Sequence, residues 1–429
     1  MSQLSDRMRG LLGTPAIGVR PSGPGPAAQA EEVGRAAEAL GGEWAGAGAR
    51  RFLVVDRCYE AGHCLGRIPV AEMLPEADGA WPGFDVLPGG AALGDSRPLL
   101  FLDLETTGLA GGAGTYPFLV GCGWFDGAAF RVRQFFLSGF TAEAALLASV
   151  ETLAARFSRL VTYNGRSFDV PLLENRFALH RMEGRVTSLP HVDLLHPARR
   201  LWSDLSGTSE GGECRLTRLE REHCAHVREG DVPGFEIPGR YFDFVRSGDA
   251  RPLEPVLEHN RLDLLALAAV TGRVSRMLAK GPSGASSPRE ALGVGRLLES
   301  AGRHTEALGC FRRAADSGAD RFTRIEGLRR LAMASRRQRR HGDAAAAWQH
   351  LADLPGCPTH IAREATEALA VHHEHRVLDL PRARSYAERS LTYEHGHGAR
   401  TALQYRLARL DRKLAVRGAS VSEPERLDW

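Results

Sequence analysis

Short apolar runs and helically spaced apolar positions alternate through the middle of the chain, between residues 98 and 280. A short apolar run is typical of a buried strand, and apolar residues three or four positions apart indicate a helix. The pattern predicts strands over 99–102, 118–125, 129–137 and 159–163, and helices over 142–157, 167–180 and 253–278. A hairpin signal, Asp126-Gly127, separates the second and third strands. We therefore expect an α/β domain whose sheet carries helices on its faces.

The segments on either side of this domain differ in character. Residues 14–50 are rich in Gly, Ala and Pro, so we expect residues 1–95 to be an N-terminal extension that is partly flexible. The α/β domain is placed at 96–280, and the run GPSGASS over 281–287 has the composition of a linker. Residues 288–415 show helical spacing without a strand pattern, and residues 416–429 are assigned to a tail.

The helical region contains a weak internal repeat. Ala307, Ala347 and Ala383 occur in similar contexts and are separated by 40 and 36 residues. Tetratricopeptide arrays have a helix–turn–helix repeat of about 34 residues, with small and aromatic residues at fixed positions. The region resembles such an array, which implies an all-α TPR-like helical-hairpin domain able to dock a protein partner.

Composition narrows the class of protein. The chain has 55 Lys and Arg against 52 Asp and Glu, and 43% of its residues are hydrophobic, as in an ordinary globular protein. No apolar run approaches the roughly 18–20 residues that span a bilayer, and the N-terminus has no secretory signal pattern. The 7 cysteines are scattered and do not form a disulfide framework. We expect a cytoplasmic protein without a membrane partner.

Two acidic residues follow the first predicted strand directly, in the segment DLETTG over 103–108. Side chains at i and i+2 of a strand share one face, so Asp103 and Glu105 project together while Leu104 turns to the core. Neighbouring carboxylates repel each other and lose hydration. A divalent cation between them relieves both costs, because hard cations prefer oxygen ligands. On its own, however, the pair is more typical of a solvated strand end.

Two further acids follow at later elements. Asp169 begins a helix just beyond the fourth strand, where the helix dipole alone also accounts for an acid. Asp263 lies within the long helix and precedes the apolar run LLALAAV. A buried helical Asp needs a partner, whereas an Asp on the exposed face needs none. Taken singly, each of these acids has a structural interpretation.

In combination, the motifs resemble the DEDD superfamily of 3′–5′ exonucleases. The resemblance rests on Asp-x-Glu-Thr-Thr-Gly at Asp103, Asn-x3-Phe-Asp ending at Asp169, and a helical Asp263 preceded by a histidine. About 160 residues separate the first acid from the last. The segments CRLTRLE, DVPGFEIPGRY, SGD and EHNRLD between residues 214 and 263 are similar to the YprB-type RNase H-like domain.

The resemblance implies a fold, a cofactor and a reaction. The fold would be an RNase H-like mixed sheet flanked by helices, followed by the TPR-like domain. Asp103, Glu105, Asp169 and Asp263 would hold two Mg²⁺ or Mn²⁺ ions. The reaction would be two-metal-ion hydrolysis of a phosphodiester bond, and the partner would be nucleic acid, either DNA or RNA.

His259 is the candidate general base. Proofreading-type members of the superfamily have a histidine five residues, or a tyrosine four residues, before the last acid. Here a histidine stands four residues before Asp263, which departs from both patterns. An offset of four still places the two side chains on one helix face. A free imidazole pKa suits general-base chemistry, although a purely structural role for His259 is equally open.

Four other residues are candidates for substrate binding. Thr106 and Thr107 would contact the terminal nucleotide, and Tyr163 and Asn164 would position the substrate. The alternative for each is that it caps the end of a strand. Asp193, in the segment HVDLLH, is expected to be a helix N-cap, with a smaller chance that it reaches the metal site.

A basic segment lies in the helical region. Residues 321–340 contain eight Arg and a single acid, Glu326. A solvated helix face is the favoured interpretation. The alternative is a stripe that follows the phosphates of a strand, and the lack of interleaved aromatic residues would restrict it to backbone contacts.

The sequence leaves two alternatives to a 3′–5′ exonuclease. The first is a catalytically weak or inactive nucleic-acid-binding module whose TPR-like domain docks a protein. The second is an RNase H-like endonuclease. Endonucleases of that type usually carry one acid on the first strand, so the Asp103/Glu105 pair favours the exonuclease.

Overall fold

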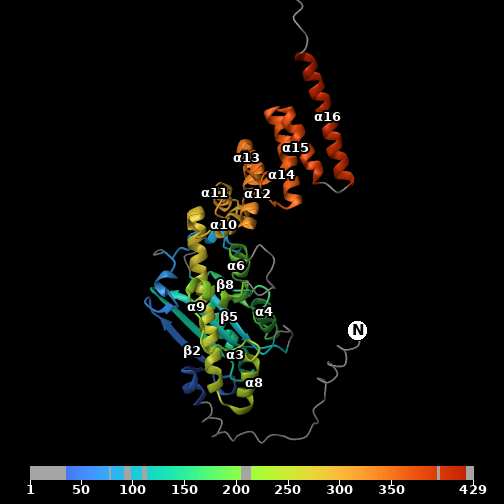
Figure 1. Cartoon of the computed structure of the whole chain (residues 1–429). Helices are drawn as coiled ribbons and strands as arrows, with labels where there is room; N and C mark the ends of the chain where they lie inside the picture. The colour runs from blue at the N-terminus through green and yellow to red at the C-terminus, as the bar shows by residue number, and fades with distance from the viewer. Residues whose placement is uncertain are drawn as a thin grey trace, which may run out of the picture.

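The computed structural model describes residues 35–76, 79–90, 98–108, 114–203, 214–393 and 397–421. A seven-stranded mixed sheet forms the N-terminal half, in the order β1-β2-β7-β6-β5-β8-β9 (Figure 1). The strands are β1 Glu43–Ala45, β2 Phe52–Tyr59, β5 Leu99–Thr106, β6 Pro117–Asp126, β7 Ala129–Phe136, β8 Arg159–Thr162 and β9 His191–Asp193. A separate small hairpin joins β3 Cys64–Leu65 to β4 Ile68–Pro69.

The direction of the strands changes at β5. β1, β2, β7, β6 and β5 pair in antiparallel fashion. β5 pairs with β8, and β8 with β9, in parallel. The C-terminal ends of β5, β8 and β9 therefore lie at one edge of the sheet, which is the edge where Asp103 and Glu105 are located.

Each face of the sheet is covered by its own hydrophobic core. Leu99 and Phe101 of β5 pack with the C-terminal two thirds of α9 (Glu254–Lys280). Leu100, Leu102 and Leu104 pack on the other face, in a core shared with α3 (Glu143–Ala154) and α4 (Asp169–Leu179). Because side chains alternate along a strand, Asp103 and Glu105 share the α9 face with Leu99 and Phe101. The remaining helices of this half are α5 Arg185–Ser188, α6 Leu195–Trp202, α7 Leu216–Leu219 and α8 Ile237–Ser247.

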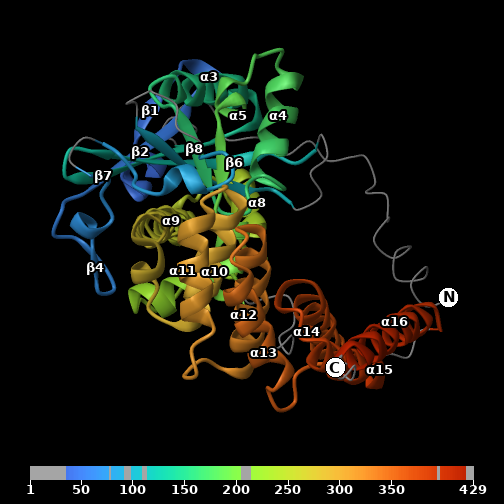
Figure 2. The same ribbon diagram turned by 90° about the horizontal axis from the view of Figure 1, so that it is seen from above.

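An all-α array follows and extends away from the sheet (Figure 1). Its helices are α10 Pro288–Ser300, α11 His304–Ala314, α12 Arg321–Arg337, α13 His341–Ala352, α14 Thr359–His372, α15 Leu380–Thr392 and α16 His397–Val421. Successive helices lie side by side as hairpins (Figure 2). The α/β sheet and the all-α region confirm the predicted fold class. The assignment of the hairpins to TPR-like repeats and the protein partner stay predictions.

The segment that separates the two parts is packed against both. Residues Gly281–Gly284 form a 3-10 turn, and Gly281 and Ala285 are buried. Leu292 and Leu297 of α10 share the hydrophobic core of Leu264 on α9. Trp202 of α6 donates to Glu290 of α10 over 3.0 Å. The first helices of the array are therefore anchored on the sheet half. No helix in the described ranges is both long and apolar enough to cross a membrane.

Candidate active site

Asp103 is oriented by a buried asparagine. The side-chain amide of Asn260, which is fully buried on α9, donates to a carboxylate oxygen of Asp103 at 2.7 Å and to its backbone carbonyl at 3.2 Å. Asp103 pairs across the sheet with Gly121. A Cβ atom at Gly121 would lie only 2.2 Å from the amide oxygen of Asn260. Glycine at this position therefore lets Asn260 approach Asp103.

Asp169 is presented by a tight turn after β8. Asn164 has a φ of 68°, in the left-handed region, and α4 begins at Asp169 itself. The carboxylate of Asp193, at the end of β9, accepts hydrogen bonds from the backbone N–H groups of Asn164 (2.8 Å) and Arg166 (3.0 Å). Asp193 also accepts from the N–H of Leu195 at 3.0 Å. Asp193 thus joins this turn to the first residue of α6; the prediction that it is the helix N-cap was wrong, because Leu194 takes that position and Asp193 ends β9.

Asp263 is held by an arginine from a different segment. The guanidinium of Arg228 donates to one oxygen of Asp263 at 2.5 Å and to Glu220 at 2.7 and 2.9 Å. Side chains of Arg228 and Glu220 are only 5% and 1% exposed, whereas Asp263 is 17% exposed. Arg228 is therefore a buried cation between two carboxylates, one of them a predicted metal ligand.

The four predicted acids influence one another electrostatically. Burial raises the pKa of Asp103 well above its ordinary value, and the charges of Asp263, Glu105 and Asp169 raise it further. Burial likewise raises the pKa of Glu105, reinforced by Asp263 and Asp169. The pKa of Asp169 rises to about 7 through burial, Asp193 and Asp263. The strand, the turn and α9 thus bring the acids near enough to repel one another, and all four remain partly exposed to solvent.

His259 lies beside this group. Its Nε2 atom is 3.6 Å from a carboxylate oxygen of Asp263, one helical turn away on α9. Its Nδ1 atom is 2.6 Å from an oxygen of Asp231. A carboxylate at Nδ1 fixes the orientation of an imidazole and leaves Nε2 directed toward the reacting groups. The geometry is compatible with a general base, and that role stays a prediction.

The predicted substrate-binding residues make contacts within the chain. Thr106 donates to the carbonyl of Gly108 at 3.0 Å, and the hydroxyl of Thr107 accepts from the N–H of Tyr116 at 2.9 Å. The hydroxyl of Tyr163 donates to the carbonyl of Cys214. These contacts stabilise loops at the same edge of the sheet, and contact with a substrate stays a prediction for Thr106, Thr107, Tyr163 and Asn164.

Several functional neighbours were missed by sequence reasoning. Asn260 and Asp231 lie within motifs that carried the family resemblance, yet neither was assigned a role. Glu220 ends the segment CRLTRLE, which carried the resemblance without a role being assigned to this residue, and no local pattern marks Arg228. An Arg that is 35 residues from Asp263 in the sequence becomes its partner only through the tertiary fold.

The donor chemistry of the four acids fits a hard cation, since all of the ligating atoms would be carboxylate oxygens. The acids are not arranged as a complete metal site. Within the described residues, no three His, Cys, Asp or Glu side chains lie close enough together to hold a metal ion. Asp263 instead accepts a hydrogen bond from Arg228, and Asp103 accepts one from Asn260. Binding a cation through Oδ1 of Asp263 would require that oxygen to exchange Arg228 for the ion.

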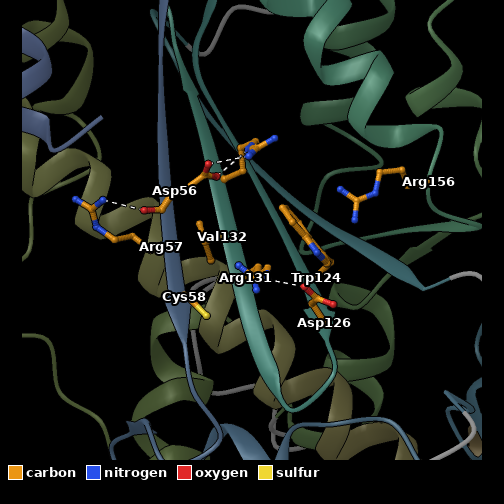
Figure 3. A pocket seen from close by; sticks show the side chains of 9 residues that line it. Asp56, Arg57, Cys58, Trp124, Asp126, Arg131, Val132 and Arg156 are labelled. Carbon is orange, nitrogen blue, oxygen red and sulfur yellow. Dashed lines mark hydrogen bonds and ion pairs between the residues drawn. The ribbon is translucent and has the colours of Figure 1, made fainter. Parts of the chain in front are cut away.

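A separate pocket of about 350 Å³ lies on β2, β6 and β7, remote from the acids (Figure 3). In β6, Gly123 pairs with Phe101 near the start of β5. The pocket residues Trp124 and Asp126 lie further along β6, away from the end of β5 that carries the acids. Arg133 forms two hydrogen bonds of 2.7 Å with Asp56, and Arg131 donates to Asp126 at 2.6 Å. The pocket's two carboxylates are thus engaged by arginines of the chain, and none of the four predicted acids lines it.

Comparison with known proteins agrees with this fold and this edge of the sheet. The RNase H superfamily model matches residues 100–275, which include all four acids. The chain thus contains an RNase H superfamily domain, and this supports a nuclease-like function.

A bacterial relative is similar over most of the chain. The protein YprB of Bacillus subtilis (strain 168), itself uncharacterized, is 30% identical over 327 residues, which cover 73% of this chain and 75% of YprB. The chain belongs to the YprB family. Among solved structures, the family B DNA polymerase of Pyrobaculum calidifontis matches with a TM-score of 0.35 and 14% identity, over 51% of this chain and 29% of the polymerase. That likeness is too slight to bear on function.

Proposed function

We propose that the chain is a nuclease that hydrolyses phosphodiester bonds with two Mg²⁺ or Mn²⁺ ions, acting as a 3′–5′ exonuclease. One observation carries the proposal: carboxylates from a strand, a turn and a helix gather at one edge of the sheet, where burial, reinforced by their mutual repulsion, raises the pKa of Asp103, Glu105 and Asp169. Such mutual repulsion is costly for folding unless a cation offsets it. Sites that gather like charges in this way are frequently catalytic.

Asp103, Glu105, Asp169 and Asp263 would hold the ions. Two such ions make hydroxide available near neutral pH and stabilise the charge that develops on the attacking and leaving oxygens. The protein would supply the orientation. Asn260 fixes the direction of the Asp103 carboxylate, and Asp231 fixes the ring of His259. His259 would accept the proton of the attacking water through Nε2.

The test is turnover of a single strand of about 30 nucleotides, labelled at its 5′ end, with Mn²⁺ or Mg²⁺. The proposal expects a ladder of products that shorten from the 3′ end, dependence on the metal, and loss of about 10³-fold or more in turnover for Asp103→Asn. Glu60→Gln, on the exposed surface, is the matched control and should retain full turnover. Unchanged turnover in Asp103→Asn would refute the assignment. Cleavage of a circular strand would instead indicate an endonuclease.

A nucleic-acid-binding module that does not cleave is the second candidate. The observation that favours it is the ion pair between Arg228 and Asp263, which neutralises one predicted ligand within the chain itself. This candidate predicts binding of the labelled strand with no products under any metal. The same assay therefore separates the two functions.

A further inference from the structure

The positive charge of the chain is concentrated in the helical array. Residues 288–421 contain 24 Lys and Arg against 15 Asp and Glu, whereas the rest of the chain contains 31 against 37. The array is therefore strongly basic and the remainder is acidic, although the whole chain carries only +3. Charge that is segregated in this way attracts polyanions to one part of a protein.

A groove of about 890 Å³ gives this charge a defined surface. It lies between α12, α13, α14 and α16 and includes residues of the turn His373–Val377. Its charged lining consists of Arg336, Arg337, Arg363, Arg376 and Arg406 against Glu364 and Glu367. We call this surface the arginine groove.

The two acids of the arginine groove are already neutralised. Glu364 accepts from Arg329 at 2.7 Å, and Glu367 accepts from Arg363 at 2.8 Å. Neither carboxylate is left to repel an anion in the groove. The basic segment over 321–340, which sequence reasoning assigned to a solvated face, is thus divided: Arg329 and Arg330 pair with acids, while Arg336 lines the groove.

The groove retains excess positive charge in two places. Arg336 and Arg376 are exposed and form no ion pair with any described residue. Arg406 shares one carboxylate, that of Glu374, with Arg409 and Lys413 at 3.1, 2.7 and 2.9 Å. Arg409 and Lys413 do not line the groove, so Arg406 is the one of these three cations that adds incompletely neutralised charge to it.

We propose that the arginine groove binds the sugar–phosphate backbone of a single-stranded nucleic acid. Guanidinium groups match phosphate oxygens with paired donors, and a basic groove that follows the backbone is a general way to hold a single strand. The lining has no exposed Phe, Tyr or Trp, because its single residue of these types, Trp348, is only 5% exposed. We therefore expect contacts to the backbone to dominate and binding to depend little on sequence. The choice of nucleic acid over other polyanions rests on the proposed nuclease function.

The test measures binding without cleavage, by fluorescence anisotropy of a labelled single strand of about 30 nucleotides in EDTA. The full chain is compared with Arg336→Gln/Arg376→Gln and with the control Arg312→Gln/Arg50→Gln, which removes two exposed arginines outside the groove. We expect the groove variant to bind about tenfold more weakly and the slope of log K against log salt to fall by about 1.4, since each phosphate contact to a single strand contributes about 0.7.

Two further variants locate the effect. Arg336→Lys/Arg376→Lys retains the charge but loses the paired donors, so it should bind more tightly than the Gln variant and more weakly than the original chain. Glu60→Gln, on the exposed surface of the sheet half, should bind the long strand as tightly as the original chain, because Glu60 lies outside the groove. Normal binding by Arg336→Gln/Arg376→Gln would overturn the inference. So would tighter binding of a poly-glutamate peptide than of the strand, because the groove would then accept an acidic protein segment.

The two proposals fail separately. If the chain binds the strand through Arg336 and Arg376 but yields no products with Mn²⁺, the nuclease proposal is refuted and the groove proposal stands. If the chain cleaves a five-nucleotide strand, and replacing both arginines does not change its affinity for the long strand, the groove proposal is refuted and the nuclease proposal stands.

Discussion

Arg228 donates a hydrogen bond of 2.5 Å to Asp263, and the same guanidinium is bound by the almost fully buried Glu220. A cation supplied by the protein thus neutralises one of the four acids at the edge of the sheet. A metal ion bound through this oxygen would have to displace the contact, so Arg228 would compete with it for Asp263.

Replacing Arg228 should destabilise the fold through Glu220. Arg228→Met leaves the buried Glu220 carboxylate with His226 as its remaining ion-pair partner, and breaking a buried pair typically costs up to about 3–5 kcal/mol. Urea unfolding of the metal-free chain measures this loss. The double variant Arg228→Met/Glu220→Gln removes both charges and should recover most of it. Equal stability of the single and double variants would show that Glu220 does not depend on Arg228.

His259 should affect turnover more than folding. His259→Asn removes the imidazole Nε2 that lies 3.6 Å from Asp263. If it takes the proton of the attacking water, kcat falls by about 10²–10⁴-fold while the thermal shift produced by Mn²⁺ remains. Asp231→Asn, which loosens the ring at Nδ1, should reduce kcat less. A kcat that is unchanged in His259→Asn assigns the residue a structural role only.

His223 should make the chain sensitive to acid. Burial, followed by the charge of Arg273, lowers the pKa of His223 from 6.5 to about 4. Its ring lies 4.3 Å from that of Trp202, and its Nε2 atom is buried without a hydrogen-bond partner among the described residues. The folded state prefers the neutral ring. The contribution of this preference to the free energy of unfolding is fully present above pH 6.5 and is lost as the pH falls through 4.

The measurement is the free energy of unfolding of His223→Leu and of the original chain at about pH 7 and about pH 4.5. The original chain should lose more stability than the variant across this interval. An equal loss in both would mean that the ring titrates in the folded protein as it does in water.

Glu374 should hold α16 to the rest of the array. Its side chain is fully buried and accepts from Arg406, Arg409 and Lys413 of that helix. Glu374→Gln leaves these cations without a carboxylate, and we expect about 2 kcal/mol less protection of residues 400–417 from hydrogen exchange. Glu388→Gln, at an exposed i,i+4 pair with Arg384, is the control and should leave the protection of α16 unchanged.

The sequence predicted the elements whose patterns are long and local. The strands around Phe118 and Phe130 were found because their apolar runs are continuous, and the helix of Asp263 because its spacing persists for many turns. β9 has three residues and β1 also has three, so neither presents a pattern long enough to detect. The linker composition over 281–287 was misleading, because Gly281 and Ala285 are buried in contacts that only tertiary structure creates.

The sequence predicted the acids of the site but not the hydrogen bonds and ion pairs that connect them to neighbouring side chains. Asp103 and Glu105 share a face because of strand geometry, which a two-residue pattern reveals. Asn260, by contrast, reaches Asp103 only because Gly121 on a neighbouring strand has no side chain. Such a relation between α9 and two strands has no local signature. The same reason explains why the cation beside Asp263 was not foreseen.

Anomalous diffraction from crystals of the full chain grown with Mn²⁺ tests the central claim most directly. The account predicts two manganese peaks bounded by Asp103, Glu105, Asp169 and Asp263, with Arg228 released from Asp263, and no peak there in Asp103→Asn. Crystals of the original chain that show no manganese between these carboxylates, with the Arg228–Asp263 ion pair intact, would contradict it.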